Sequence, residues 1–217
     1  MYSCAGKVQI YYEVYGEGKP LILVHGNGES HEIFDAAVKD LQREYKVYLV
    51  DSRCHGKSSD TEQISYELMR DDLITLIRQE QLIKPVFYGF SDGGILGLMI
   101  AIKEPDLLSK LIISGANLNP KGLKWWSLLE MRFEYLFTKN KLIKMMLKEP
   151  DLKPEDLAKI RIPTIVLAGE KDVIRRRHTE EIAAGIRNSV LEILPGENHG
   201  SYIIHSEKLY PVLKKYL

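Results

Sequence analysis

A serine stands in a tight turn between an apolar run and a helix-like stretch. Residues 89–93 read Gly-Phe-Ser-Asp-Gly, a G-x-S-x-G pattern with Ser91 at its centre. The apolar run 85–88 precedes the pattern, and an apolar stretch of helical length follows it at 94–101. Small neighbours let a serine occupy a strained turn, with its Oγ exposed beside the N-terminus of the next helix. The pattern predicts a nucleophile at Ser91; a plain turn is the alternative interpretation.

A serine hydroxyl needs a base to take its proton, and the base needs an acid to orient it. The carboxyl ends of parallel strands share one edge of a sheet, so the acid is expected just after a later strand. The strand-like run 164–168 leads into Gly-Glu-Lys-Asp at 169–172, whereas the loop after 111–113 has no carboxylate. Asp172 is therefore the favoured acid. Glu170, closer to the strand end, is the weaker candidate, and a helix N-terminal role is the alternative for Asp172.

Three histidines follow Asp172, and their positions differ. His178 lies in the helical stretch 176–186, and His205 lies in the expected last helix. His199 instead follows the strand-like run 190–194, in a loop at the same edge of the sheet. The chain order serine, acid, histidine is that of a triad on this kind of sheet. We therefore expect Ser91, Asp172 and His199 to form a catalytic triad, with His199 as the general base.

A glycine-containing loop follows the buried strand-like run 21–24 and reads His-Gly-Asn-Gly at 25–28. Glycines let the backbone turn its N–H groups towards negative charge that develops on a carbonyl oxygen. The expected oxyanion-hole donors are the N–H of Asn27 and the N–H of Asp92, the residue after Ser91. His25 is interpreted as a structural histidine that bonds the loop backbone.

These motifs resemble those of the α/β-hydrolase fold superfamily, in the broad group of its small single-domain serine esterases. The loop Asp-Ser-Arg-Cys-His-Gly-Lys-Ser at 51–58 is similar to the family segment D-x-R-G-H-G-x-S, with Cys54 where glycine is usual. The resemblance covers nearly the whole chain except roughly residues 117–160. It implies a mostly parallel central sheet with helices on both faces, and a short helical lid inserted at 117–160.

Strand and helix patterns alternate along the chain, which also indicates an α/β fold with a mostly parallel sheet. Only the turn Tyr15–Lys19 separates the first two strands. This turn is too short for a helical crossover, so these two strands are expected to pair antiparallel at the sheet edge. We expect a single domain over residues 1–217. Strands are expected near 7–14, 20–25, 46–51, 85–90, 109–114, 163–168 and 189–194, and helices near 30–43, 64–81, 92–104, 175–187 and 203–216.

The segment 117–160 breaks this alternation and is rich in large apolar side chains. It predicts two short helices, and a lid this short favours a small or partly exposed substrate. Most of its aromatic residues are expected to pack the lid onto the main domain, while Trp125, Trp126 and Phe133 are candidates for substrate contacts. Residues 117–150 contain seven Lys or Arg and three Glu. We interpret this excess as a solvated face, with attraction of anionic substrates as the alternative.

The composition limits which binding partners and which cellular compartment are expected. Thirty basic and thirty acidic residues cancel, which gives no general attraction to nucleic acid or to an anionic membrane. Two distant cysteines, Cys4 and Cys54, fit a reducing compartment. No signal peptide, no apolar run of ~20 residues and no metal-ligand spacing is found. We expect a cytoplasmic protein without metal or cofactor that acts on a small molecule as a monomer or homodimer.

Together these features predict a serine hydrolase that cleaves a small carboxylic ester or related acyl compound through an acyl-enzyme. Two alternatives stay open. The same triad could hydrolyse a carbon–carbon bond or catalyse perhydrolysis. The chain could also be a ligand-binding signalling protein whose triad turns over slowly or only once. Fold alone does not decide among them.

Overall fold

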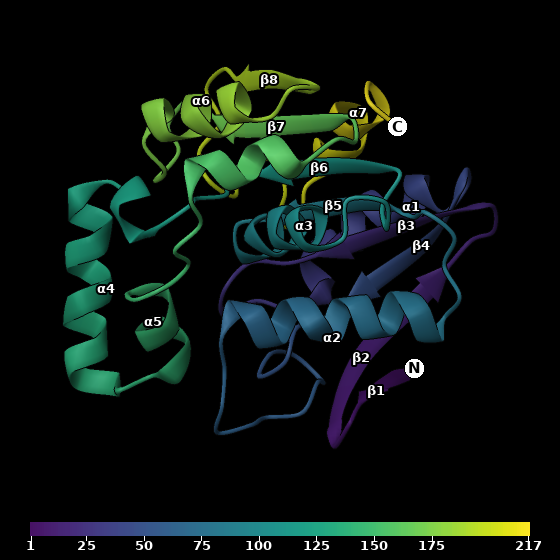
Figure 1. Cartoon of the computed structure of the whole chain (residues 1–217), viewed down its shortest axis with the longest axis horizontal. Helices are drawn as coiled ribbons and strands as arrows, with labels where there is room; N and C mark the ends of the chain where they lie inside the picture. Colours follow the sequence, from purple (N-terminus) through teal and green to yellow (C-terminus); the bar gives the residue numbers. More distant parts are fainter.

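A computed structural model describes the backbone of residues 1–217 and every side chain except that of Ala5. Eight strands form one sheet in the order β1-β2-β4-β3-β5-β6-β7-β8 (Figure 1). The strands β3 to β8 are parallel, and β2 runs antiparallel to both of its neighbours. Their bounds are β1 (Tyr2–Ala5), β2 (Val8–Tyr15), β3 (Lys19–Val24), β4 (Tyr45–Val50), β5 (Val86–Phe90), β6 (Lys110–Ser114), β7 (Thr164–Gly169) and β8 (Ser189–Leu194).

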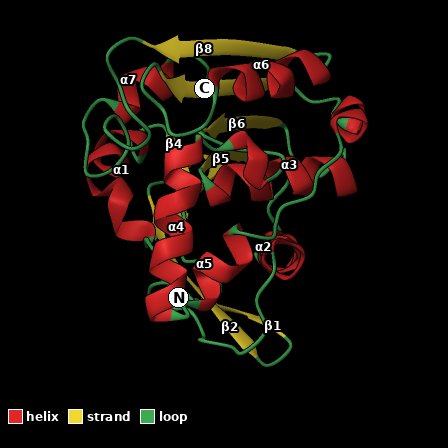
Figure 2. Cartoon of the chain, turned by 90° about the vertical axis from the view of Figure 1, so that its left-hand side faces the viewer, coloured by secondary structure: helices red, strands yellow, loops and turns green.

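Helices cover both faces of this sheet (Figures 1 and 2). One buried apolar cluster joins α2, α3 and α6 to one face, and a second joins α1 and α7 to the other. The α/β-hydrolase architecture predicted from the sequence is confirmed. The helices are α1 (Asp35–Leu41), α2 (Tyr66–Gln79), α3 (Asp92–Lys103), α4 (Trp125–Thr138), α5 (Lys141–Met146), α6 (Arg176–Gly185) and α7 (Leu209–Lys214), with 3₁₀ helices η1 (His31–Phe34), η2 (Pro120–Gly122) and η3 (Pro154–Lys159).

The continuous apolar runs of the central strands follow from this two-sided cover. Every residue of β5 and of β7 is buried. Successive side chains of a strand point to opposite faces. Phe87 accordingly lies in the cluster with α2 and α3, and its neighbour Tyr88 lies in the cluster with α1 and α7. A strand buried on both faces needs apolar residues at every position, which is the pattern the sequence carries.

The expected pairing of the first two strands with each other is wrong. The strand β4 lies between them: β2 pairs antiparallel with β4, with Tyr12 opposite Val50, and β4 pairs parallel with β3. The buried backbone of β4 needs hydrogen-bond partners on both edges, and the two flanking strands supply them. The connecting turn carries Gly16 at φ 71°, where a Cβ would lie 2.2 Å from the carbonyl oxygen of Gln42. The turn therefore packs under the connection that leads into β4.

The last helix is shorter than the predicted range 203–216. Residues 201–205 form turns, and helix α7 covers only residues 209–214. His205 has a φ of 51°, which a right-handed helix does not allow. Its N–H donates to the carbonyl oxygen of Ile33 at 2.8 Å, so this turn is anchored to η1. A tertiary contact here outweighs the local helical pattern.

The segment 117–160 contains η2, α4, α5 and η3, and α4 and α5 are the two short helices expected there. Helix α4 stands apart from the layers of the sheet and forms the outer edge of the molecule on one side (Figure 1). In Figure 2, where that side faces the viewer, α4 lies at the front of the molecule with α5 beside its lower part. None of the described helices combines the length and the apolar character that a membrane crossing requires.

Candidate active site

Ser91 occupies a sharp turn between β5 and α3. Its φ and ψ are 51° and −111°, a strained conformation for a residue with a Cβ. Both glycines of the motif are held at close approach. A Cβ on Gly89 would lie 2.1 Å from the carbonyl oxygen of Gly93, and a Cβ on Gly93 would lie 2.2 Å from that of Val24. Any larger side chain at either position would push the turn out of shape.

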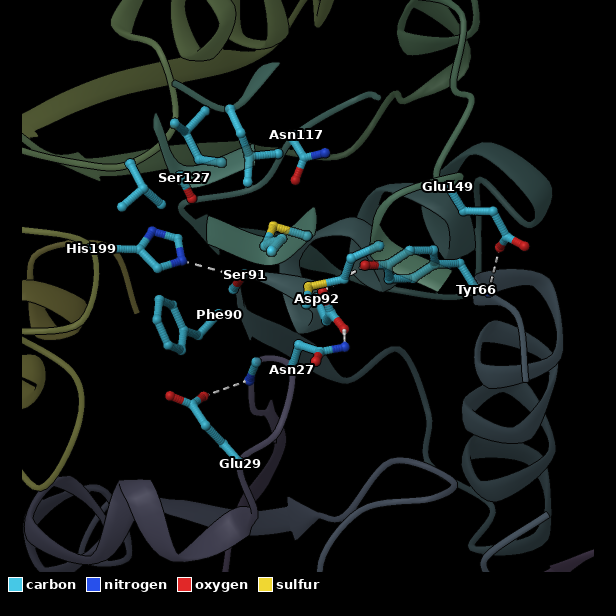
Figure 3. Close-up of a pocket in the computed structure, with 16 residues that line it drawn as sticks. Asn27, Glu29, Tyr66, Phe90, Ser91, Asp92, Asn117, Ser127, Glu149 and His199 are labelled. Atoms are coloured by element: carbon cyan, nitrogen blue, oxygen red, sulfur yellow. Dashed lines mark hydrogen bonds between the residues drawn. The ribbon is translucent and has the colours of Figure 1, made fainter. Parts of the chain in front are cut away.

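The imidazole of His199 lies between the hydroxyl of Ser91, which Figure 3 shows, and the carboxylate of Asp172. Its Nε2 is 3.1 Å from Ser91 Oγ, and its Nδ1 is 2.7 Å from Asp172 Oδ1. A carboxylate only accepts hydrogen bonds, so Nδ1–H donates to Asp172 and Nε2 can accept from the serine hydroxyl. The ring of Phe90 packs against the imidazole with 4.9 Å between ring centroids. The three residues named from chain order are thus brought into contact.

The two acids after β7 have separate positions. Asp172 is buried, and its Oδ1 also accepts the N–H of Ile174 at 2.9 Å. Glu170 is exposed, and its Oε2 accepts the N–H of Gly196 at 2.8 Å, in the loop that carries His199. Asp172, the favoured candidate, is the acid that contacts the imidazole, while Glu170 steadies the loop from outside.

Gly115 is a site residue that the sequence analysis missed. It follows β6 with a φ of 63°, and a Cβ there would lie 2.6 Å from His199 Cε1. The position therefore needs glycine for its backbone conformation and for the space taken by the imidazole. A glycine directly after a central strand was the available signal, since it marks a close approach at the same edge of the sheet.

The side chains of Asn27 and Asp92 are hydrogen-bonded to each other, with 2.9 Å between Asn27 Nδ2 and Asp92 Oδ2. This bond fixes the loop after β3 beside the turn at Ser91, so the two expected oxyanion donors belong to one connected unit. The neighbouring N–H groups of Gly26, Ser91 and Gly93 already donate hydrogen bonds to other acceptors within the protein. The loop after β3 and the N-terminus of α3 are therefore held next to Ser91.

The carboxylate of Asp92 links three parts of the fold. Besides Asn27, it accepts the hydroxyl of Tyr66, with 2.6 Å between the oxygens. Both residues are buried, and burial raises the pKa of each. The N–H of Tyr66 in turn donates at 3.0 Å to Oε2 of Glu149, which belongs to the segment 117–160. The sequence analysis used only the backbone of Asp92; its side-chain role depends on the tertiary position of Tyr66 and could not be read from the motif.

The pocket above Ser91 has a volume of about 200 Å³. Its walls come from the segment 117–160 and from other parts of the chain, and three carboxylates lie among them (Figure 3). The lining residues are Gly26, Asn27, Glu29, Tyr66, Phe90, Ser91, Asp92, Asn117, Leu123, Ser127, Met131, Met146, Glu149, Val173, Ile174 and His199. Among the described residues, no group of three or more His, Cys, Asp or Glu is arranged to hold a metal ion.

The three aromatic candidates in the segment 117–160 lie away from this pocket. Trp125, Trp126 and Phe133 are 70%, 38% and 55% exposed on the outer side of α4. Ser127 and Met131, four residues apart and therefore on one side of the helix, face the pocket instead. The expectation that the aromatic residues contact substrate does not fit this geometry, because the helix turns its smaller and more flexible side chains inwards.

Two other loops support the site. His25 is buried, with Nδ1 at 2.7 Å from the carbonyl oxygen of Gly26 and with Nε2 accepting the N–H of Ser52 at 3.1 Å. Burial lowers its pKa to about 4, so it stays neutral near pH 7 and fits its structural interpretation. Cys54 has a φ of 63°, a conformation that favours glycine. That conformation explains why the similar family loop has glycine at this place.

A family model described as "alpha/beta hydrolase fold" matches residues 19–142, more than half of the chain. The chain belongs to this family. The resemblance inferred from the motifs is therefore confirmed.

Relatives and solved structures agree with this assignment. The chain is 32% identical over 114 residues to the sn-1-specific diacylglycerol lipase ABHD11 of Danio rerio, a match that covers 50% of this chain and 36% of the lipase. It is 24% identical to the serine hydrolase BPHL of Homo sapiens, over 97% of this chain and 83% of that protein. The esterase EaEST of Exiguobacterium antarcticum shares the fold, with a TM-score of 0.86 at 21% identity over 99% and 98% of the two chains. The protein is an α/β-hydrolase enzyme.

We predict that Tyr66→Phe destabilises the protein by about 1–3 kcal/mol, because it removes a donor from the buried carboxylate of Asp92. The matched control is Tyr210→Phe, whose hydroxyl donates to Glu44 at the surface and whose loss should cost less than about 0.5 kcal/mol. Urea denaturation measures both. Equal effects of the two substitutions would contradict a special role for the Tyr66–Asp92 bond.

Proposed function

We propose that this α/β-hydrolase cleaves a small carboxylic ester or related acyl compound through a covalent acyl-enzyme. The observation that carries the proposal is the chain of short contacts from Ser91 Oγ to His199 Nε2 and from His199 Nδ1 to the buried Asp172. This arrangement joins a nucleophile to a base and the base to an orienting acid. The hydrolase relatives support the same class of reaction.

In the proposed mechanism, Ser91 Oγ attacks the carbonyl carbon of the substrate while His199 Nε2 takes the hydroxyl proton. Asp172 keeps the imidazole in the required tautomer and stabilises the imidazolium. The oxyanion accepts hydrogen bonds from the N–H groups of Asn27 and Asp92. The hydrogen bond between the side chains of these two residues holds both N–H groups in place. His199 then protonates the leaving alcohol. A water molecule activated by the same imidazole attacks the acyl-enzyme and releases the acid.

The lining of the pocket favours a small substrate that carries no negative charge close to the pocket walls. We take residues 117–160 as a lid on a single domain, because Ser127 and Met131 close the space above Ser91. The volume of about 200 Å³ lies below the ~300–1,000 Å³ usual for ligand pockets. Glu29, Asp92 and Glu149 face the pocket, and its described lining holds no Lys or Arg. A neutral or positively charged acyl or alcohol group meets these carboxylates more favourably than an anionic one.

Removal of the nucleophile tests the proposal directly. We expect Ser91→Ala to lower turnover of short p-nitrophenyl esters by roughly 10⁴-fold or more, while the folded structure is kept. The wild type should hydrolyse many ester molecules per protein molecule, which a slow-turnover signalling protein would not do. Initial rates with substrate in large excess over enzyme measure both properties. Near-native turnover by Ser91→Ala would remove this serine from the mechanism.

The two acids after β7 offer a matched pair of substitutions. Asp172→Asn should lower kcat by several orders of magnitude, because the amide no longer holds His199 in the useful tautomer. Glu170→Gln should have only a small effect, since Glu170 contacts the loop backbone and not the imidazole. Steady-state kinetics of both variants give the comparison. A larger loss in Glu170→Gln than in Asp172→Asn would reverse the assignment.

The inward face of α4 should set the size of the acyl group. Met131→Ala enlarges the pocket and should shift the preference between short and longer acyl chains by ~1–3 kcal/mol. Phe133→Ala, on the outer side of the same helix, is the control and should leave the profile unchanged. The measurement is kcat/KM for a series of p-nitrophenyl esters of rising chain length. A shift in Phe133→Ala alone would mean that the outer residues bind substrate.

A further inference from the structure

Helix α4 exposes a row of large apolar side chains that the proposed reaction does not use. Six of its fourteen residues belong to this row. At about 100° of rotation per residue they cover an arc of roughly 120° on one side of the helix. The row, called here the outer face of α4, consists of Trp125 (70% exposed), Trp126 (38%), Leu129 (45%), Phe133 (55%), Leu136 (60%) and Phe137 (83%).

The outer face of α4 is turned away from the rest of the molecule. The helix forms the outer edge of the molecule in Figure 1 and lies at the front in Figure 2. Ser127 and Met131, which line the catalytic pocket, lie on the opposite side of the helix. An aromatic side chain offers about 150–250 Å² of surface, so six residues at these exposures form a patch of several hundred Å². Patches of that size mark interaction sites.

The charge of the lid segment indicates which partner fits. The whole chain is neutral, but residues 117–150 carry seven Lys or Arg and three Glu, a local excess of four positive charges. Of these cations, Lys141 forms a salt bridge with Asp60. Within α4 itself the exposed Arg132 stands beside two exposed glutamates, Glu130 and Glu134. The positive excess lies in the residues that flank α4 in the chain, with Lys121 and Lys124 before it and Lys139, Lys144 and Lys148 after it.

We propose that the outer face of α4 docks on an anionic lipid surface. The helix would lie in the plane of the interface, with its aromatic side chains at the boundary of headgroups and acyl chains and with the neighbouring cations near the phosphates. At 14 residues, or about 21 Å, α4 is too short to span a bilayer but long enough to lie on one. The balanced total charge of the chain conceals this local attraction.

A second copy of the chain fits the same face less well. Two-fold packing of α4 against α4 would bring two lid segments together, each with an excess of four positive charges. Like charges that face one another across an interface oppose association. An anionic surface neutralises the same charges. Because Ser127 and Met131 belong to the docked helix, the catalytic pocket would lie directly behind the lipid contact.

The chain offers its own probe of this docking. Its two tryptophans, Trp125 and Trp126, both lie on the outer face of α4. Vesicles of phosphatidylcholine with about one third phosphatidylserine should shift their emission to the blue, and lipids brominated on the acyl chains should quench it. Vesicles of phosphatidylcholine alone should give a much weaker response. The measurement needs no substrate, so its outcome is independent of the proposed hydrolysis.

Substitutions separate the apolar and the charged parts of the contact. Leu136→Ser with Phe137→Ser should weaken vesicle binding at least about tenfold, whereas Ile83→Ser, an exposed apolar position outside the lid, should not. Lys139→Gln, Lys144→Gln and Lys148→Gln together should remove the preference for phosphatidylserine. The same changes at Lys7, Lys19 and Lys84 are the charge-matched control. An unchanged far-ultraviolet circular dichroism spectrum and urea midpoint of each variant show that the fold is kept.

Two results would overturn the proposal. One is wild-type protein whose tryptophan emission ignores both vesicle types. The other is a blue shift that brominated lipids do not quench, together with a dimer in light scattering that Leu136→Ser with Phe137→Ser dissociates; that result would assign the outer face of α4 to a second copy of the chain.

Discussion

The strained backbone of Ser91 is the constraint on which the rest of the site depends. A non-glycine residue at φ 51° and ψ −111° costs about 1–3 kcal/mol, so its surroundings must hold it there. The N–H of Ser91 donates to the carbonyl oxygen of Ser114 at 2.7 Å, which ties the turn to β6. The N–H of Gly93 donates to the carbonyl oxygen of His25, and this bond ties the turn to the loop after β3. These bonds also set the distance between Ser91 and the loop of Asn27.

The parallel strands place the other residues of the site next to the strained turn at Ser91. The strands β5, β7 and β8 end at one edge of the sheet, and the loops after them bring Ser91, Asp172 and His199 together. Each loop has a further support of its own, such as the Glu170 bond to Gly196 or the space that Gly115 leaves for the imidazole. Positioning within about 0.5 Å depends on such supports more than on the three contacting residues themselves.

The sequence predicted the parts that local pattern and chain order determine. Continuous apolar runs marked the buried strands, and the order of Ser91, Asp172 and His199 fitted their meeting at one edge. It did not predict that β4 lies between β2 and β3, because a short turn limits direction but not the choice of neighbour. The sequence also did not predict which side of α4 faces the pocket. A helix with apolar residues on most of its sides does not reveal which side turns to the pocket.

Hydrogen bonds between side chains of distant segments were also not predicted from the sequence. The carboxylate of Asp92 joins Asn27 and Tyr66, which lie 65 and 26 positions away in the chain. A motif identifies the residue after the nucleophile for its N–H, and only the tertiary structure shows what its side chain holds. The loop after β3, the turn at Ser91 and the start of α2 therefore form one unit through a single buried carboxylate.

We propose that Ser91 carries the acyl group during turnover. The most direct measurement is mass spectrometry of the protein quenched with acid while it hydrolyses p-nitrophenyl acetate. The account predicts one acetyl group per chain, located by peptide fragmentation on Ser91 and lost when the substrate is exhausted. Active enzyme that carries no acetyl group at Ser91 under these conditions, or that carries it on another residue, would contradict the account.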